Sequence, residues 1–283
     1  MINEWINEYN PKGKDEAEAA LREIMQEVAL AGLQRSGFFE VAAFYGGTAL
    51  RIFHGLDRFS EDLDFSLLQR NEAFSLEPYL SGIVTEFEGL GMQVSVREKK
   101  KKVATGVDSA FLKSETVWKE LTLDGAIPQL GLTLPPALKI KLEVDREPPL
   151  GFSTEELLLI RPFSFYVKCF TLPDLFAGKM HALLFRKWGT RVKGRDWYDL
   201  EWYVKKGIPL HLEHFRLRAV DSKDWTEDII SEEQFRELLT KRIESVSFAS
   251  IREDVVRFIP DATKLEIWSP QYFKDLAKRL KIQ

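Results

Sequence analysis

The stretch FYGGTALRIFHGLDRFSEDLDFSL, which runs from Phe44 to Leu67, decides the fold. A Gly-Gly-Thr step at 46–48 follows an apolar run, and an Asp-Leu-Asp triplet at 62–64 comes after a further thirteen residues. A β-strand places alternate side chains on one face, so Asp62 and Asp64 would project together while the leucine between them enters the core. The stretch therefore predicts two carboxylates that share one spot on a sheet.

These two carboxylates indicate a divalent-metal site. Like charges held this close raise each other's pKa unless a cation sits between them. Pairs of oxygen ligands suit Mg²⁺ better than zinc, and the four histidines of the chain have no partners at the spacing of a zinc site. We therefore expect Mg²⁺ at Asp62 and Asp64.

The Gly-Gly-Thr step predicts a phosphate site. Gly46 and Gly47 allow the backbone to approach a phosphate closely, and Thr48 adds a hydroxyl. The apolar residues of 49–53 have helical spacing, so a helix N-terminus would meet the phosphates there. An Asp-x-Asp alone is more often a solvated loop, and Gly-Gly alone is more often a turn. The two features together, in this order, are much more specific.

The whole stretch resembles the nucleotidyltransferase fold superfamily, in which a Gly-Gly or Gly-Ser helix start precedes an Asp-x-Asp strand. Within that superfamily, GGTAL followed by RFSEDLDF is similar to the AbiEii group of toxins from bacterial abortive-infection (type IV toxin-antitoxin) systems. The resemblance implies a metal-dependent transfer of a nucleoside monophosphate from an NTP, with two Mg²⁺ ions. It also includes Arg58 and Ser60 in the nucleotide-binding motif, although a solvated turn would explain the arginine equally well.

Residues 139–145 form the clearest strand of the chain, because Ile140, Leu142 and Val144 alternate strictly with charged residues. A charged face of this kind is also typical of a strand that faces solvent. Nucleotidyltransferases take a third acidic ligand from a strand beside the Asp-x-Asp strand. The resemblance therefore selects Glu143 first and Asp145 second, with Lys141 as a candidate phosphate contact.

A second group of charged residues begins in a predicted helix at 174–188. Lys179 stands on a side of this helix that is otherwise apolar, where it either extends along its stem to water or holds a charge in a cleft. A basic run (Arg186, Lys187, Arg191, Lys193 and Arg195) leads into Asp196 and Asp199, which lie one helical turn apart. Asp196 could cap its helix, and Asp199 could pair with Arg195.

The AbiEii-like group has a distal motif of this shape, and GRDWYDL at 194–200 is similar to it. The resemblance implies that Lys179 and Asp196 help catalysis, with Asp199 near them. It also implies an RNA acceptor, the 3′ end of tRNA, which the basic run could receive. A cognate antitoxin that acts without a stable complex is a further implication.

Composition and pattern set the expected fold and compartment. The chain has 283 residues, of which 45% are hydrophobic and 30% charged, and its net charge is −4. One cysteine, no long apolar run and no signal-peptide pattern predict a cytoplasmic protein with no membrane association. We expect an α+β fold: a nucleotidyltransferase-like domain over 1–165, with a mixed sheet and flanking helices, followed by a helical domain over 166–283.

Helical patterns are predicted at 14–34, 76–90, 174–188, 196–206, 226–246, 251–258 and 270–280. Two other functions remain open from the residues alone. One is a nucleotidyltransferase that modifies a small hydroxyl compound, as antibiotic-modifying enzymes do. The other is a nucleotide- or RNA-binding module without turnover, which the intact Asp-x-Asp triplet disfavours.

Overall fold

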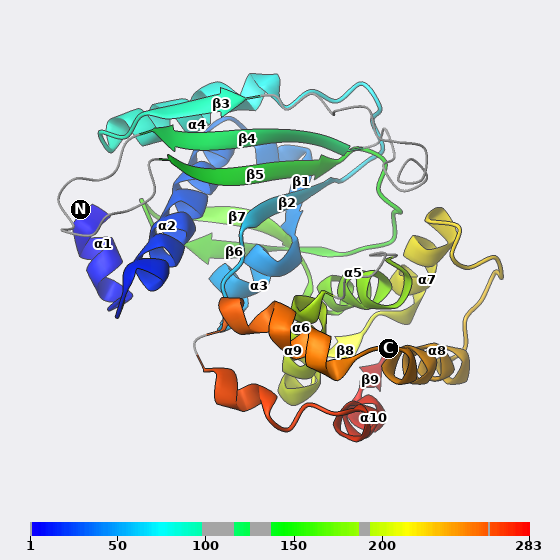
Figure 1. Cartoon of the computed structure of the whole chain (residues 1–283). Helices are drawn as coiled ribbons and strands as arrows, with labels where there is room; N and C mark the ends of the chain where they lie inside the picture. Colours follow the sequence, from blue (N-terminus) through cyan, green and yellow to red (C-terminus); the bar gives the residue numbers. More distant parts are fainter. Residues whose placement is uncertain (1, 98–115, 125–136, 187–192, 260) are drawn as a thin grey trace, which may run out of the picture. The chain divides into compact units, whose positions relative to one another are not determined.

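The structure is a computed structural model, and it describes residues 2–97, 116–124, 137–186, 193–259 and 261–283 (Figure 1). The chain forms two compact units, each assembled from segments that are separate in the sequence. Unit 1 comprises Met1–Phe53, Ser60–Pro148 and Glu156–Cys169, and unit 2 comprises His54–Phe59, Pro149–Glu155 and Phe170–Gln283. The domain boundary expected after residue 165 stays a prediction.

Unit 1 is built around a mixed sheet, to which seven described strands belong in the order β3-β4-β5-β2-β1-β7-β6 (Figure 1). The β2–β5 and β1–β7 pairs are parallel, whereas β1–β2, β3–β4 and β4–β5 are antiparallel. The strands are β1 (Ala42–Tyr45), β2 (Asp62–Leu67), β3 (Val94–Arg97), β4 (Thr116–Asp124), β5 (Ala137–Asp145), β6 (Thr154–Leu159) and β7 (Phe165–Phe170).

Helices of unit 1 pack with the sheet around an aromatic core. They are α1 (Ile2–Glu8), α2 (Lys14–Arg35), α3 (Gly46–His54) and α4 (Glu77–Gly89), with a short 3₁₀ turn η1 (Phe38–Glu40). Phe38 and Phe44 pack on the ring of Phe65, with ring centroids 5.0 and 5.2 Å away. A Cβ on Gly32 of α2 would overlap the backbone of Ile83 in α4, so the glycine permits the close helix packing.

Strand β5 has the two-faced character that its sequence predicts. Ile140, Leu142 and Val144 are fully buried in the core. The charged residues between them point to the opposite face, because side chains alternate along a strand. The α+β class expected from the sequence is therefore confirmed, with a mixed sheet and flanking helices.

Unit 2 contains helices packed around buried aromatic residues such as Trp197, Tyr203 and Phe215. The elements are α5 (Leu172–Phe185), α6 (Gly194–Lys206), β8 (Pro209–Leu210), α7 (Leu212–Asp221), α8 (Glu232–Ser245), α9 (Phe248–Val255), η3 (Val256–Phe258), η4 (Ala262–Leu265), α10 (Pro270–Arg279) and β9 (Lys281–Ile282). Among the described residues, no helix is long and apolar enough to cross a membrane.

The helix expected over 226–246 begins later than predicted, at Glu232. Ser231 accepts a hydrogen bond from the backbone N–H of Gln234, and the Gln234 side chain accepts one from the Ser231 N–H. This capping box satisfies the first turn of α8 and fixes its start. The predicted boundary at residue 226 is therefore wrong.

Candidate functional site

The paired strands β2 and β5 bring four charged residues onto one face of the sheet. In the parallel ladder, Asp62 lies opposite Lys141 and Asp64 lies opposite Glu143. Residues that are partners in a ladder project from the same face, and alternation puts both aspartates on it. Leu63, between them, is fully buried on the other face. The predicted shared position of Asp62 and Asp64 is therefore present in the structure.

Helix α3 starts directly after β1, at Gly46. Gly46 has a φ of +87°, and a Cβ at this position would overlap the Asp64 carboxylate. Both facts require glycine, because other residues rarely adopt positive φ and would displace the carboxylate. Gly47 follows as a buried residue within the first turn of α3. The Gly-Gly step thus lies beside the aspartate pair.

Thr48 is fully buried, and its hydroxyl donates a hydrogen bond to the backbone carbonyl of Asp62. This bond ties the first turn of α3 to the start of β2. The hydroxyl that the sequence assigns to a phosphate is therefore engaged with the strand that carries the aspartates. Its contact with a nucleotide stays a prediction.

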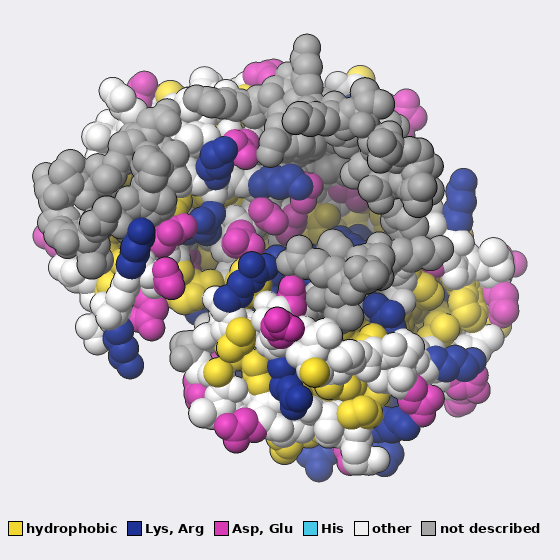
Figure 2. Space-filling model, in the orientation of Figure 1, with side chains coloured by type: hydrophobic (Ala, Val, Ile, Leu, Met, Phe, Trp, Pro, Cys, Tyr) yellow, Lys and Arg dark blue, Asp and Glu magenta, His cyan; other side chains and the backbone are white. Residues whose placement is uncertain are grey.

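Charges of both signs gather over β5 and the strands beside it (Figure 2). The Lys141 ammonium forms an ion pair with Glu143 on the same strand face. Lys139 pairs with Glu120 of β4 at 3.0 Å, and Glu120 is itself the ladder partner of Lys141. Asp145, the alternative third carboxylate, lies opposite Ser66 and accepts a hydrogen bond from the Glu147 N–H at 3.1 Å. Glu143 is thus nearer in register to the aspartate pair.

The donor chemistry of this face fits a hard divalent cation. Asp62 and Asp64 are partly exposed carboxylates on one face, and the Glu143 carboxylate is next to Asp64 in register. Within the described ranges, no group of three or more His, Cys, Asp or Glu side chains is arranged to hold a metal ion. Asp62 and Asp64 are the primary candidate ligands because both lie on the motif strand, and Glu143, which pairs with Lys141, is the further candidate.

Ser60 and Arg58, the remaining residues of the first motif, differ in environment. The Ser60 carbonyl accepts a hydrogen bond from the Gln26 side chain at 3.2 Å within unit 1. Arg58 belongs to unit 2, and only 2% of its side chain is exposed. Its guanidinium donates two hydrogen bonds to Asp199, at 2.6 and 2.7 Å. Arg58 is therefore held by a carboxylate in the protein interior.

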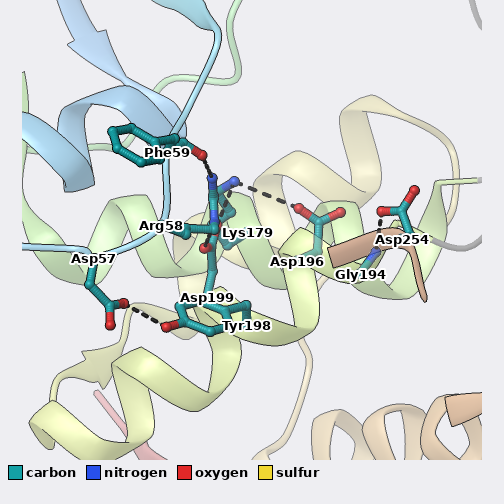
Figure 3. Close-up of polar contacts among 9 residues, drawn as sticks. All are labelled: Asp57, Arg58, Phe59, Lys179, Gly194, Asp196, Tyr198, Asp199 and Asp254. Atoms are coloured by element: carbon teal, nitrogen blue, oxygen red, sulfur yellow. Dashed lines mark hydrogen bonds and ion pairs between the residues drawn. The ribbon is translucent and has the colours of Figure 1, made fainter. Parts of the chain in front are cut away.

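Lys179 joins the same buried group in unit 2 (Figure 3). Its ammonium lies 2.8 Å from Asp199 and 3.6 Å from Asp196. Burial alone would raise the pKa of the Asp199 carboxyl, but Arg58 and Lys179 outweigh it and lower that pKa to about 2. Asp199 is thus an anion that two cations share, and the structure brings Lys179 and Asp196 together as the sequence predicts.

The two local alternatives, a helix cap by Asp196 and a pair between Asp199 and Arg195, are not what the structure shows. Helix α6 begins at Gly194 without a side-chain cap of its own, and the Gly194 N–H donates to Asp254 at 2.9 Å. Asp196 therefore does not cap this helix. The Arg195 guanidinium lies over the Phe258 ring, 4.1 Å from its centroid, while Asp199 pairs with Arg58.

Part of the basic run can be placed. Arg186, Lys193 and Arg195 are described, whereas Lys187 and Arg191 lie outside the described residues. Burial lowers the pKa of the Lys193 ammonium to about 8; Asp196 opposes this shift, and the cations Lys179, Arg186 and Arg195 reinforce it. The described part of the run is therefore a cluster of cations close to Asp196.

Sequence reasoning missed two features of the site. The partner of Arg58 is Asp199, 141 residues further along the chain, and no local pattern indicates so distant a pair. Glu120 was missed because the pattern around β4 does not separate helix from strand. The alternation of Leu121 and Leu123 with Glu120, Thr122 and Asp124 was a short signal for that strand.

Comparisons with known proteins bear on this geometry. Residues 28–279 match the family model described as nucleotidyl transferase AbiEii toxin, type IV TA system. The chain belongs to this family. AbiEii proteins are toxin nucleotidyltransferases, so this chain is a nucleotidyltransferase. Membership also implies a nucleotide substrate and an antitoxin as the partner in the system.

A solved structure supports the fold of this AbiEii protein. The nucleotidyltransferase toxin MenT4 of Mycobacterium tuberculosis matches with a TM-score of 0.53 and 16% identity, over 99% of each chain. JHP933 of Helicobacter pylori matches with a TM-score of 0.46 and 17% identity, over 92% of this chain and 88% of that one. The search of curated proteins found no match.

Proposed function

We propose that this AbiEii protein transfers a nucleoside monophosphate from an NTP to the 3′ end of tRNA in a reaction that depends on Mg²⁺. The observation that best supports this proposal is the register of β2 and β5. It puts Asp62, Asp64 and Glu143 on one sheet face beside the Gly46 turn. This combination provides carboxylates for a metal and a helix start for phosphates at the same edge.

The start of α3 would bind the phosphates of the nucleotide. Its first N–H groups have no partners within the helix, and the helix dipole favours negative charge there. Gly46 keeps space open between this turn and the Asp64 carboxylate. Thr48 holds the turn against β2 through the Asp62 carbonyl. The distal phosphates of the NTP would therefore bind within reach of the aspartates.

Asp62 and Asp64 would hold Mg²⁺, two ions by analogy with two-metal sites, and Glu143 would be a further ligand or the base. The metal supplies electrostatic stabilisation of the charge that develops on the phosphoryl oxygens. Lys141, which pairs with Glu143 in the structure, would exchange that partner for a phosphate. The motif predicts a nucleotide contact for Arg58, but its guanidinium is buried on Asp199, so a direct contact with phosphate is not part of this proposal.

The transfer itself conserves atoms and charge. The acceptor hydroxyl oxygen forms a bond to the α-phosphorus of the NTP, and the bond from that phosphorus to the oxygen bridging to the β-phosphate breaks. Pyrophosphate leaves with that bridging oxygen. Where Glu143 acts as the base and not as a ligand, its carboxylate would take the hydroxyl proton.

Lys179 and Asp196 would help catalysis, as the resemblance of their motif to the family implies. An ammonium held largely away from water by two carboxylates can exchange part of that pairing for the negative charge of a triphosphate.

The RNA acceptor is supported by the cation cluster of Arg186, Lys193 and Arg195 near Asp196. Clustered cations bind a phosphate backbone even on a protein whose net charge is −4.

The test is incubation of the protein with each labelled NTP and total RNA, with and without Mg²⁺, followed by separation of the RNA species. The proposal expects label on the tRNA fraction with Mg²⁺ and none without it. Label on another RNA and not on tRNA would overturn the tRNA assignment but not the transfer activity. Absence of label from all RNA, with pyrophosphate released on addition of small hydroxyl compounds, would favour the antibiotic-type activity.

A further inference from the structure

Four charged side chains form one buried group in unit 2: Arg58, Lys179, Asp196 and Asp199 (Figure 3). Asp199 is fully buried, and Arg58 is 2% exposed, whereas the Lys179 side chain is 17% exposed. Charges this deeply buried are costly unless each has a partner with good geometry. Lys179 is therefore the member of the group with the most access to a ligand.

The Asp199 carboxylate is fixed by Arg58. The guanidinium binds both carboxylate oxygens, with Nε on Oδ1 at 2.6 Å and Nη2 on Oδ2 at 2.7 Å. A two-bond pairing of this kind sets the plane of the carboxylate, which a single bond does not. The Lys179 ammonium binds Oδ2, the same atom that Nη2 holds, at 2.8 Å. The orientation of Asp199 therefore determines where the ammonium lies.

Arg58 is itself anchored at several points. Its Nη1 donates to the Phe59 carbonyl at 3.1 Å, and the Phe59 N–H donates to the Phe258 carbonyl at 3.0 Å. The preceding residue, Asp57, accepts hydrogen bonds from Tyr198 and Lys264, each at 2.6 Å. The bonds to Phe59 and Asp199 therefore hold the guanidinium itself, whereas the Asp57 contacts hold only the neighbouring residue.

We propose that Arg58 and Asp199 are positioning residues for Lys179: Asp199 holds the ammonium, and Arg58 fixes the carboxylate that does so. The proposal rests on the proposed role of Lys179 in transfer. It assigns the arginine of the RFSEDLDF motif to the orientation of a distant lysine and not to a direct contact with phosphate. A guanidinium that is 2% exposed and bonded to Asp199 and Phe59 has little surface left for a ligand.

The proposal differs from a purely structural ion pair in what it predicts for Lys179. A structural pair would affect stability, and variants that fold would keep normal turnover. A positioning pair would leave the fold in place while the ammonium loses its location. Two readouts separate these cases: turnover against nucleotide affinity, and the chemical accessibility of the Lys179 amine.

The main variant is Arg58→Lys, which keeps the positive charge and removes the two-bond pairing. The matched control is Asp57→Asn, which weakens the Tyr198 and Lys264 contacts of the same segment and leaves Asp199 and Lys179 unchanged. Full-length proteins that show a cooperative thermal transition are compared. If Arg58→Lys does not fold, the double variant Arg58→Met/Asp199→Leu replaces it, because it removes both buried charges together.

Turnover and affinity are measured as kcat and KM for the NTP that the wild-type protein uses. We expect kcat to fall at least tenfold in the Arg58 variant, while its KM changes less than threefold. In the Asp57 control, both kcat and KM should stay within threefold of the wild-type values. A KM that rises tenfold with unchanged kcat would make Arg58 a ground-state phosphate contact. A kcat within threefold of wild type would make the pair structural. Either result overturns the proposal.

Amine accessibility is measured without turnover, as the acetylation rate of Lys179 by an N-hydroxysuccinimide ester, followed by peptide mass spectrometry. The rate should rise at least fivefold in the Arg58 variant and stay within twofold in the Asp57 control. An unchanged rate overturns the positioning role. A separate Lys179→Met variant with normal turnover would instead show that the proposed function of Lys179 is wrong, so the two failures can be told apart.

Discussion

Asp64 of β2 and Glu143 of β5 are direct partners in a parallel ladder, and the same register places Lys141 opposite Asp62. A shift by one residue would turn every charged side chain of β5 toward the buried face. The fully buried Ile140, Leu142 and Val144 prevent that shift. The apolar half of β5 therefore fixes the position of the polar half, and the core determines the geometry of the candidate site.

Gly46→Ala should damage activity more than stability. The new methyl group would overlap the Asp64 carboxylate, and the residue would keep a φ of +87°. The backbone strain costs roughly 1–2 kcal/mol for a residue with a Cβ, which denaturant unfolding would measure. Turnover should fall by more than this cost explains, because Asp64 is displaced. Gly55→Ala, also at positive φ but with open space around its Cβ, is the matched control.

Thr48→Ala should loosen the link between α3 and β2. The lost hydrogen bond to the Asp62 carbonyl is worth about 0.5–1.5 kcal/mol of unfolding free energy. Thr48→Ser keeps the hydroxyl and should restore most of the loss. Equal stability of the alanine and serine variants by denaturant titration would show that this bond contributes nothing.

The stability of unit 1 should depend on pH through Glu27 of α2. Burial raises the pKa of the Glu27 carboxyl to about 7, although the Arg161 guanidinium at 3.0 Å opposes the shift. The folded protein therefore binds this proton more tightly than the unfolded chain. The contribution of Glu27 is complete below about pH 4.5, the value for an unfolded glutamate, and is lost as the pH rises through about 7.

Glu27→Gln removes this titration and should flatten the fall in unfolding free energy between pH 5 and pH 8. Glu18→Gln, on the exposed side of the same helix, is the control and should leave the slope unchanged. A Glu27→Gln protein with the wild-type slope would mean that another group carries the pH dependence.

Arg186→Gln should weaken RNA binding if the cation cluster contacts the phosphate backbone. Each phosphate contact that is lost lowers the slope of log K against log salt by about one. A filter-binding titration with tRNA over a range of salt concentrations measures this slope. Lys241→Gln changes an exposed lysine that pairs only weakly with Glu237, at 3.7 Å, and should have no effect. Identical slopes for both variants would exclude Arg186 from the RNA site.

Much of the fold follows from local pattern. The helix predicted at 14–34 is α2, the strand predicted at 139–145 lies within β5, and the helix predicted at 196–206 ends at Gly207 as expected, where φ is +68°. These elements have strong periodicity and clear end signals. Strand β6 was not predicted, because its apolar residue Leu158 is exposed and its pattern does not mark a core face.

The candidate site was predictable where its residues are close in sequence. Asp62 and Asp64 share a face because strand geometry alone requires it. The Arg58–Asp199 pair was not predictable, since 141 residues separate the partners and a local partner, Arg195, was available for Asp199. Only tertiary packing shows that Arg195 lies over Phe258, which leaves Asp199 to Arg58 and Lys179.

The most direct test of the central claim is transfer of labelled nucleotide to tRNA by the Asp62→Asn and Asp64→Asn variants across a Mg²⁺ titration. Asparagine keeps the shape of the side chain and removes the charge that a divalent cation requires. Both variants should unfold cooperatively, with a thermal midpoint at or above that of the wild type, because a like-charge pair is relieved. Their transfer activity should fall by several orders of magnitude at every Mg²⁺ concentration. Folded variants that transfer nucleotide at near wild-type rates would contradict the central claim.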